Sequence, residues 1–154
     1  MLQLLTTFDG RISRKSYWIG GLLLLAMMVV MFIVIGGAFA VVYALTGWSP
    51  SANSLAERLT VVVMTLIILP PGYALLRKRV NDLDHPSWTV LVSLGLIGLD
   101  LVANLLGGSY FQGVAMTVVG LLVTANCLWA IAIGVIPGTA GPNRHGPDPL
   151  TPAA

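Results

Sequence analysis

Charge is the scarcest property of this sequence of 154 residues, of which only 9% are charged and 56% are hydrophobic. Soluble domains carry about a quarter charged residues, and a domain of ~150 residues buries only about 70% of its surface on folding. A soluble core therefore cannot hide this much apolar surface. The net charge of +2 is too small to indicate binding to nucleic acid.

Cysteine and the residue patterns of common enzymes are also scarce. The one cysteine, Cys127, excludes an internal disulfide and a cysteine-based zinc cluster. The two histidines, His85 and His145, are 60 residues apart, and there is no HxxxH or HExxH pair. A P-loop, a dinucleotide-binding glycine motif and GxSxG are likewise absent. We therefore expect no metal, no cofactor and no enzymatic activity.

The sequence does contain four long apolar runs typical of membrane-spanning helices. The first has no charged residue and is too long for the apolar region of a signal peptide. The second is interrupted by Pro70-Pro71-Gly72, and the third holds one acid, Asp100. We predict a single all-α membrane domain over residues 1–154, a four-helix bundle with spans at residues 17–45, 59–76, 88–106 and 113–136.

The positions of the basic residues predict the orientation of this bundle. Residues 1–16, the link between the second and third spans, and the tail at 137–154 hold seven of the eight lysines and arginines. The positive-inside rule places these segments, and with them both termini, in the cytoplasm. An even number of spans agrees with this placement.

The segment FDGRISRKSYW leads into the first span. Ser13 is a predicted N-cap, whereas Arg14 and Lys15 in the first turn oppose the helix dipole. Anionic lipid phosphate would offset this conflict by about 1 kcal/mol per basic residue. We expect a face that contacts lipid or a partner, formed by Arg11, Arg14, Lys15, Arg77, Lys78 and Arg79. Aromatic anchors at the membrane interface are expected at Tyr17, Trp18 and Trp88.

Three polar residues lie inside the predicted spans. Asp100 and Asn104 are one helical turn apart, and antiparallel packing would bring Asn126 to a similar depth. Such an acid either joins neighbouring helices through hydrogen bonds, handles protons or cations, or lies at a shallow depth where it meets water. The Pro70-Pro71 pair removes two backbone donors, which gives either a kink or a hinge of the kind found in transporters. These alternatives stay open from the sequence.

The link RKRVNDLDHPSW between the second and third spans also holds two acids, Asp82 and Asp84. Acids add little to membrane attraction, so we expect Asp82 to bind neighbouring segments. Its candidate partners are Arg11, Arg14 and the backbone N–H groups of the turn at 143–146. Such contacts would join three segments into a cytoplasmic cap built from Asp82, Asn143, Gly146 and Asp148.

Three motifs, FDGRISRKSYW, KRVNDLDHPSW and GTAGPNRHGPDP, stand in this order around the four spans. Together they resemble the bacterial family called domain of unknown function 805, and the resemblance covers nearly the whole chain. It implies a small multi-pass protein of the inner membrane with no established activity. The sequence departs from the family pattern at Asn81, where histidine is usual, and at Asp84, where glycine is usual.

Two functions fit these features. The first is a non-enzymatic bundle that binds a partner protein or anionic lipid through its basic cytoplasmic face. The alternative is a small oligomeric channel or transporter that uses Asp100 and the Pro70-Pro71 break. An intramembrane enzyme is disfavoured because Asp100 alone lacks the second group that acid–base chemistry needs. The expected partners are anionic membrane lipids and a membrane protein or a second copy of the chain.

Overall fold

The computed structural model describes residues 2–47, 55–106 and 113–151. Within these ranges the chain forms five helices and no β-strand. Four of the helices are long and apolar enough to cross a membrane, which confirms the predicted all-helical membrane fold. The helices are α1 (Leu2–Thr6), α2 (Arg14–Thr46), α3 (Leu55–Asp82), α4 (Trp88–Leu106) and α5 (Val114–Val135).

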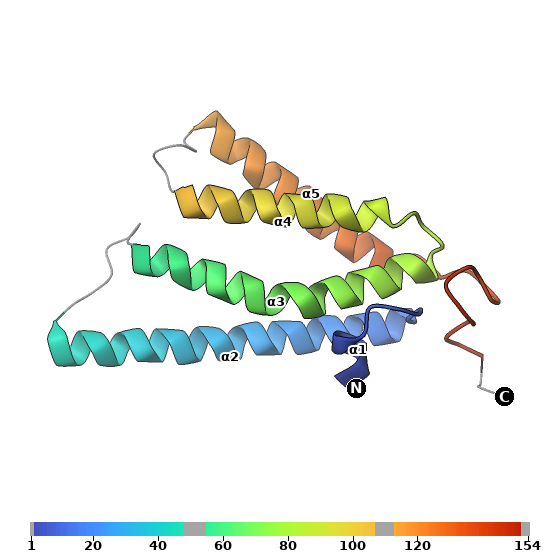
Figure 1. Ribbon diagram of the computed structural model, residues 1–154, viewed down its shortest axis with the longest axis horizontal. Helices are drawn as coiled ribbons and strands as arrows, with labels where there is room; N and C mark the ends of the chain where they lie inside the picture. Colours follow the sequence, from blue (N-terminus) through green and yellow to red (C-terminus); the bar gives the residue numbers. More distant parts are fainter. Residues whose placement is uncertain (1, 48–54, 107–112, 152–154) are drawn as a thin grey trace.

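Helix α3 is the centre of the bundle, because it packs against each of the other four helices. Helices α2 and α3 run side by side in opposite directions, and α4 and α5 form a second layer beside α3 (Figure 1). The N-terminal segment and the tail both lie where α3 ends and α4 begins (Figure 1). The three segments that carry the sequence motifs therefore meet at one end of the bundle.

Helix α2 begins three residues before the predicted span. The Ser13 hydroxyl accepts a hydrogen bond from the backbone N–H of Ser16 at 3.3 Å, so the predicted N-cap is confirmed. The helix has 33 residues and is about 50 Å long at 1.5 Å per residue. This exceeds the ~30 Å hydrocarbon core of a bilayer, so α2 must tilt or extend beyond it.

Helix α3, which is curved along its length (Figure 1), runs through Pro70 and Pro71 and continues past residue 76, where the predicted span ends. The prediction that the charged link starts at Arg77 is therefore wrong. The helix stops after Asp82 in a Schellman-type end: the N–H of His85 bonds to the carbonyl of Val80 and that of Asp84 to Asn81, both at 3.2 Å. Asp84 has φ 53°, the left-handed conformation that glycine adopts most readily.

The other two spanning helices lie close to their predicted positions. Helix α4 has the predicted bounds, and α5 is one residue shorter at each end than predicted. The tail contains no helix over residues 137–151. The two links at 48–54 and 107–112, with parts of the predicted loops, lie outside the described residues.

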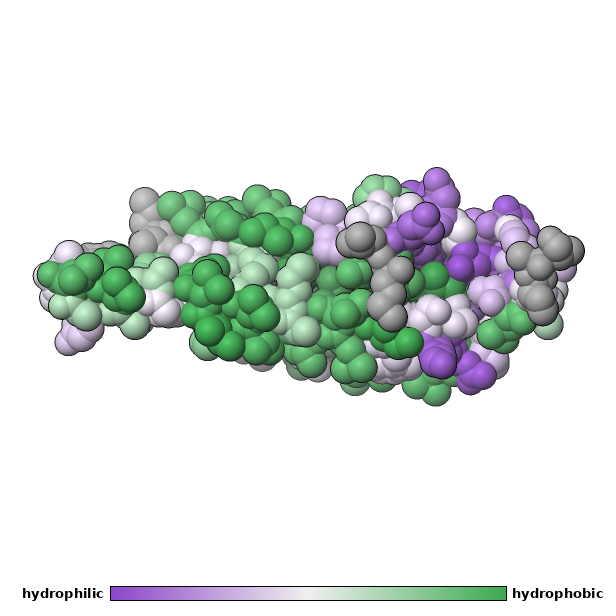
Figure 2. All heavy atoms as spheres, turned by 90° about the horizontal axis from the view of Figure 1, so that it is seen from below, coloured by the Kyte–Doolittle hydropathy of each residue, from purple (hydrophilic) through white to green (hydrophobic). Residues whose placement is uncertain are grey.

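Hydrophilic side chains gather at the end of the molecule that holds the tail and α1, and apolar side chains cover most of the remaining surface seen in Figure 2. A buried hydrophobic cluster that includes Ile12, Tyr17, Leu75 and Ile133 supports the hydrophilic end. Large apolar side chains such as Leu45 (80% exposed) and Val114 (79% exposed) mark the opposite end. A surface of this kind is stable in lipid rather than in water.

Candidate functional site

The hydrophilic end contains a buried network that we call the polar cluster: Arg11, Lys78, Arg79, Asn81, Asp82, Thr139 and Asn143. Its members come from the segment before α2, the last turn of α3 and the tail. Every side-chain nitrogen or oxygen atom that is fully buried in the described part of the chain has a hydrogen-bond partner. The network is thus complete, which is the condition under which buried polar groups stabilise a fold.

Arg79 is the centre of the polar cluster, and its side chain is fully buried. Its Nε donates to the carbonyl of Ile133 at 2.8 Å, and its Nη2 donates to that of Ile136. One further nitrogen, Nη1, donates both to Asp82 and to the carbonyl of Ile12 at 3.2 Å. The guanidinium therefore binds the C-terminal end of α5, where free carbonyls and the helix dipole favour a cation.

Asp82 binds two arginines at once. One carboxylate oxygen accepts from Arg79, and the other lies 3.1 Å from both Nε and Nη2 of Arg11. Arg11 was one of the predicted partners of Asp82; within the described residues the carboxylate bonds neither to Arg14 nor to the 143–146 turn. Both arginines are almost fully buried, at 1% and 0% exposure. Two arginines and one carboxylate carry a net charge of plus one. The backbone carbonyls that accept from the two arginines offset this charge.

The tail packs against Arg11 and Asp82 and bonds to both. Arg11 donates to the carbonyls of Gly141 at 2.7 Å and Gly146 at 3.3 Å, and to Thr139 through Nη2. The backbone N–H of Thr139 in turn bonds to the carbonyl of Asp82 at 2.9 Å. A Cβ atom on Gly138 would lie 2.0 Å from the Asp82 carboxylate. Only glycine therefore lets the tail approach the carboxylate this closely.

Two asparagines complete the connection between the three segments. Asn81 donates to the carbonyl of Gly10 at 3.1 Å, and Asn143 donates to the carbonyl of Asn81 at 2.9 Å. Asn81, at the position where the family pattern has histidine, thus has a structural role. Asn143 also pairs through its backbone with Gly146.

Asp148, the fourth residue of the predicted cap, orders the tail itself and does not contact Asp82. Its carboxylate accepts from the backbone N–H groups of Leu150 and Gly141, both at 2.9 Å. These two bonds, with that to Leu150 the stronger influence, hold the pKa of the Asp148 carboxyl below its usual value of 3.8. The group is therefore anionic at neutral pH.

Lys78 fixes the short helix α1 against α3. Its ammonium group donates to the carbonyls of Gln3 at 2.7 Å and Leu4 at 2.9 Å. The residue is 4% exposed, so it makes these bonds away from solvent. It thus binds carbonyls at the end of a helix, as Arg79 does at the end of α5.

The predicted lipid-contacting face is therefore wrong for three of its six members. The side chains of Arg11, Lys78 and Arg79 are buried and donate to acceptors of the protein, so they are not available to lipid phosphate. The sequence could not distinguish them from cations that face solvent, because all six share charge and position. Three members remain exposed or half-buried at the surface: Arg14, Lys15 and Arg77.

The predicted aromatic anchors divide in a similar way. Tyr17 is buried and donates its hydroxyl to the carbonyl of Ala130 at 2.9 Å. Trp18 is 44% exposed and donates to the carbonyl of Gly134 at 3.1 Å. Trp88 is largely exposed at the start of α4. Trp18 and Trp88 thus have the exposure that an interfacial anchor needs, whereas Tyr17 joins α2 to α5.

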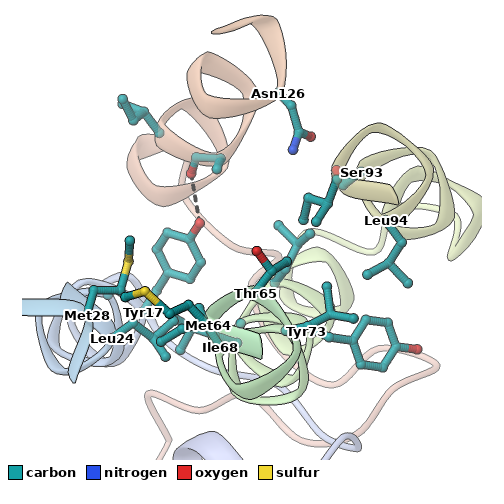
Figure 3. Close-up of a pocket in the computed structure, with 18 of the residues that line it drawn as sticks. Tyr17, Leu24, Met28, Met64, Thr65, Ile68, Tyr73, Ser93, Leu94 and Asn126 are labelled. Atoms are coloured by element: carbon teal, nitrogen blue, oxygen red, sulfur yellow. Dashed lines mark hydrogen bonds between the residues drawn. The ribbon is translucent and has the colours of Figure 1, made fainter. Parts of the chain in front are cut away.

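The three polar residues inside the spans do not form one site. The Asn104 amide donates to the backbone carbonyl of Asp100 at 2.8 Å, and no hydrogen bond or ion pair of the Asp100 carboxylate is found within the described residues. Asn126 instead lines a cavity of about 580 Å³ between α2, α3, α4 and α5 (Figure 3). Neither Asp100 nor Asn104 is among its lining residues.

No group of three or more His, Cys, Asp or Glu side chains in the described ranges could hold a metal ion. His145 lies 3.9 Å from Asp84, which also pairs with Arg144 at 2.8 Å. Cys127 is exposed on the apolar surface of α5.

Sequence reasoning missed Thr139 and Asn81 and gave the central role to Asp82 rather than to Arg79. One signal for the role of Arg79 was available, since Asp82 follows it at the i, i+3 spacing that lets two side chains pair on a helix. The glycines at 138 and 141 flank Thr139 in the same motif. Glycines allow a backbone to approach another segment closely. Their positions could therefore have indicated that the backbone around Thr139 contacts a neighbouring segment.

Comparisons with known proteins agree with this architecture. A family model described as "Protein of unknown function (DUF805)" matches residues 5–147. The Inner membrane protein YhaH of Escherichia coli, in strains K12 and O157:H7, is 25% identical over 146 residues, which cover 92% of this chain and 86% of the relative. No solved structure matches the chain.

The family match includes all three segments that build the polar cluster, from Arg11 to Asn143. Four helices of spanning length and an inner-membrane relative place the chain in the bacterial inner membrane. The chain belongs to the family described as Protein of unknown function (DUF805).

Proposed function

We propose that this protein is a non-enzymatic membrane bundle that binds anionic lipid headgroups at the end where the polar cluster lies. The observation that carries the proposal is the division of the cations at this end. Arg11, Lys78 and Arg79 hold the fold together, whereas Arg14 and Lys15 lie exposed in the first turn of α2. These two have no carboxylate partner in the part of the chain that the structure describes.

The position of Arg14 and Lys15 favours lipid as their partner. At a helix N-terminus they oppose the dipole of α2, a conflict that an anionic phosphate relieves. The half-exposed ring of Trp18 lies within the same turn of α2, at the headgroup depth that tryptophan favours. The other exposed cations are partly neutralised, since Arg77 lies 3.6 Å from Asp9 and Arg144 lies 2.8 Å from Asp84.

The arrangement gives less support to a small oligomeric channel or transporter. That alternative depended on Asp100 and on a break at Pro70-Pro71. The structure has a continuous α3 through both prolines, and Asp100 does not line the cavity between the helices. No observation in the described residues connects the two features into one pathway, so the lipid-binding proposal is preferred.

Native mass spectrometry of the protein released from bilayers of phosphatidylethanolamine and phosphatidylglycerol tests the proposal. We expect phosphatidylglycerol to be enriched on the protein and the enrichment to fall to the bulk ratio in the Arg14→Gln/Lys15→Gln variant. Arg58→Gln, at the opposite end of the bundle, is the matched control and should keep the enrichment. Equal lipid ratios on wild type and double variant would overturn the proposal, as would displacement of the bound lipid by a protein that contacts the same two side chains.

A further inference from the structure

The cavity between α2, α3, α4 and α5 has a composition that neither the proposed lipid face nor the polar cluster explains. Its walls are almost entirely apolar and include no charged side chain. Its volume of about 580 Å³ falls within the range of ~300–1,000 Å³ typical of ligand pockets. Gly21 and Gly72 lie in its walls, where the absence of side chains leaves room.

Three helices each contribute one polar side chain to this cavity: Thr65 from α3, Ser93 from α4 and Asn126 from α5. All three point toward the space between the helices (Figure 3). None of them makes a hydrogen bond to any residue that the structure describes. By contrast, the hydroxyl of Tyr17 in the same wall is already bound to the carbonyl of Ala130.

Ser93 is the most informative of the three because the residue is 2% exposed. Side-chain oxygen atoms that are fully enclosed by described residues all have partners. The Ser93 hydroxyl has none, so it must face open space inside the bundle rather than packed protein. A hydroxyl in a largely apolar space costs free energy until something bonds to it.

The geometry points to a binding site for a neutral lipid that carries one hydroxyl or carbonyl oxygen on a hydrocarbon chain. Thr65, Ser93 and Asn126 can each donate to that oxygen, and the two hydroxyls and the amide can accept from it. The uncharged wall excludes an ionic headgroup, which would lose its hydration without gaining a counter-charge. The wall on α2 extends from Tyr17 to Met28, about 16 Å along the helix, which suits an extended hydrocarbon chain.

Photolabelling of the full chain in lipid nanodiscs tests this site. The probe is a long-chain fatty alcohol that carries a diazirine and an alkyne, and its control is the matching alkane probe without the hydroxyl. We expect the alcohol to label residues that line the cavity about three- to tenfold more than the alkane, the advantage of one or two ordinary hydrogen bonds. Equal labelling by the two probes would overturn the proposal.

Filling the cavity provides the matched comparison of variants. A Cβ atom at Gly21 meets no other atom within 4 Å, and the same holds at Gly37 on the exposed part of α2. Leucine favours a helix more than glycine does, so both Gly21→Leu and Gly37→Leu should fold. We expect Gly21→Leu to reduce labelling of the cavity about tenfold or more and Gly37→Leu to leave it unchanged. Unchanged labelling in Gly21→Leu contradicts the site.

Removal of the polar groups separates binding from a structural role. Ser93→Ala and Asn126→Leu should each retain the thermal midpoint of the wild type, because neither side chain bonds to any residue that the structure describes. Both variants should lose the preference for the alcohol probe over the alkane probe. Loss of folding with an unchanged preference would overturn the assignment. Competition with ubiquinone, a prenyl alcohol or diacylglycerol then identifies the source, and displacement by phosphatidylglycerol alone would refute a neutral ligand.

Discussion

At one end of the bundle, Arg11, Arg79 and Asp82 join three segments of the chain through buried hydrogen bonds. At the other end, α2 and α5 present exposed apolar side chains such as Leu45 and Val114. Among the described residues, Arg58 makes one long bond there, of 3.5 Å, to the carbonyl of Leu105. Because lipid is as apolar as leucine, burial of apolar surface does not drive helices together in a membrane. The polar cluster therefore supplies the specificity of packing, and lipid solvates the rest.

The largest effect is expected when Arg79 is replaced by alanine. The change leaves the Asp82 carboxylate with one fewer counter-charge and the carbonyls of Ile133 and Ile136 without donors. Removal of one partner from a buried charge network costs about 3–5 kcal/mol. We expect this loss in the free energy of unfolding, measured by sodium dodecyl sulfate titration in mixed micelles.

Arg77→Ala is the control for that measurement, two residues away on the same helix. Its side chain is 38% exposed and lies 3.6 Å from an exposed carboxylate, an arrangement worth about 0–1 kcal/mol. Equal losses in Arg77→Ala and Arg79→Ala would show that the buried network has no special role, and would remove the difference between the two ends.

A second effect is expected at the close contact between α2 and α5. A Cβ atom at Gly134 would lie 2.9 Å from ring atoms of both Tyr17 and Trp18. Gly134→Ala should lower the free energy of unfolding by about 1–3 kcal/mol, since the rings must move apart. On the same helix Gly120 has no atom within 4 Å of such a Cβ, so Gly120→Ala should raise stability by up to about 1 kcal/mol through helix propensity. Losses of the same size in both variants would contradict the contact.

The tail should show a smaller effect that depends on pH. The pKa of Asp148 is lowered from 3.8 by the backbone N–H groups of Leu150 and Gly141, so its contribution to stability is present above pH 3.8 and is lost as pH falls through the lower folded value. We expect Asp148→Asn to have a slightly lower thermal midpoint than wild type at neutral pH. This difference should disappear in acid below the folded value, and a difference that grows there would refute the assignment.

The smallest effect is expected for Asp100→Asn. Its carboxylate makes no bond to the described residues, and the amide of Asn104 bonds to its backbone carbonyl rather than to its side chain. The free energy of unfolding should change by less than about 0.5 kcal/mol, as for a residue outside a bonded network. A loss of 2 kcal/mol or more, of roughly the size of a broken buried bond, would show that the far end also depends on polar contacts.

Patterns that repeat along the chain predicted the fold well. Apolar runs and the Ser13 cap placed the helices, because both signals depend on residues close in sequence. The end of α3 was misplaced because the prediction stopped where the apolar run stops, whereas the helix continues through charged residues that bond to segments distant in sequence. The pairing of Asp82 with Arg11 could be suggested from charge, whereas the burial of Arg79 depends on carbonyls 54 and 57 residues away. The cavity depends on how four helices pack, which no local pattern encodes.

The long separation between Arg79 and its carbonyl acceptors has a consequence for how the protein is made. At a synthesis rate of about 5–20 residues per second, Ile136 follows Arg79 by roughly 3–11 s. During that interval the other charged members of the polar cluster, Arg11, Lys78 and Asp82, already exist. Asp82 is the one acid among them, so it is the only carboxylate of the cluster with which Arg79 can pair before the last helix is made. The buried network is complete only when the end of α5 and the tail have been made, so a chain that stops before Ile133 leaves donors of Arg79 without these acceptors.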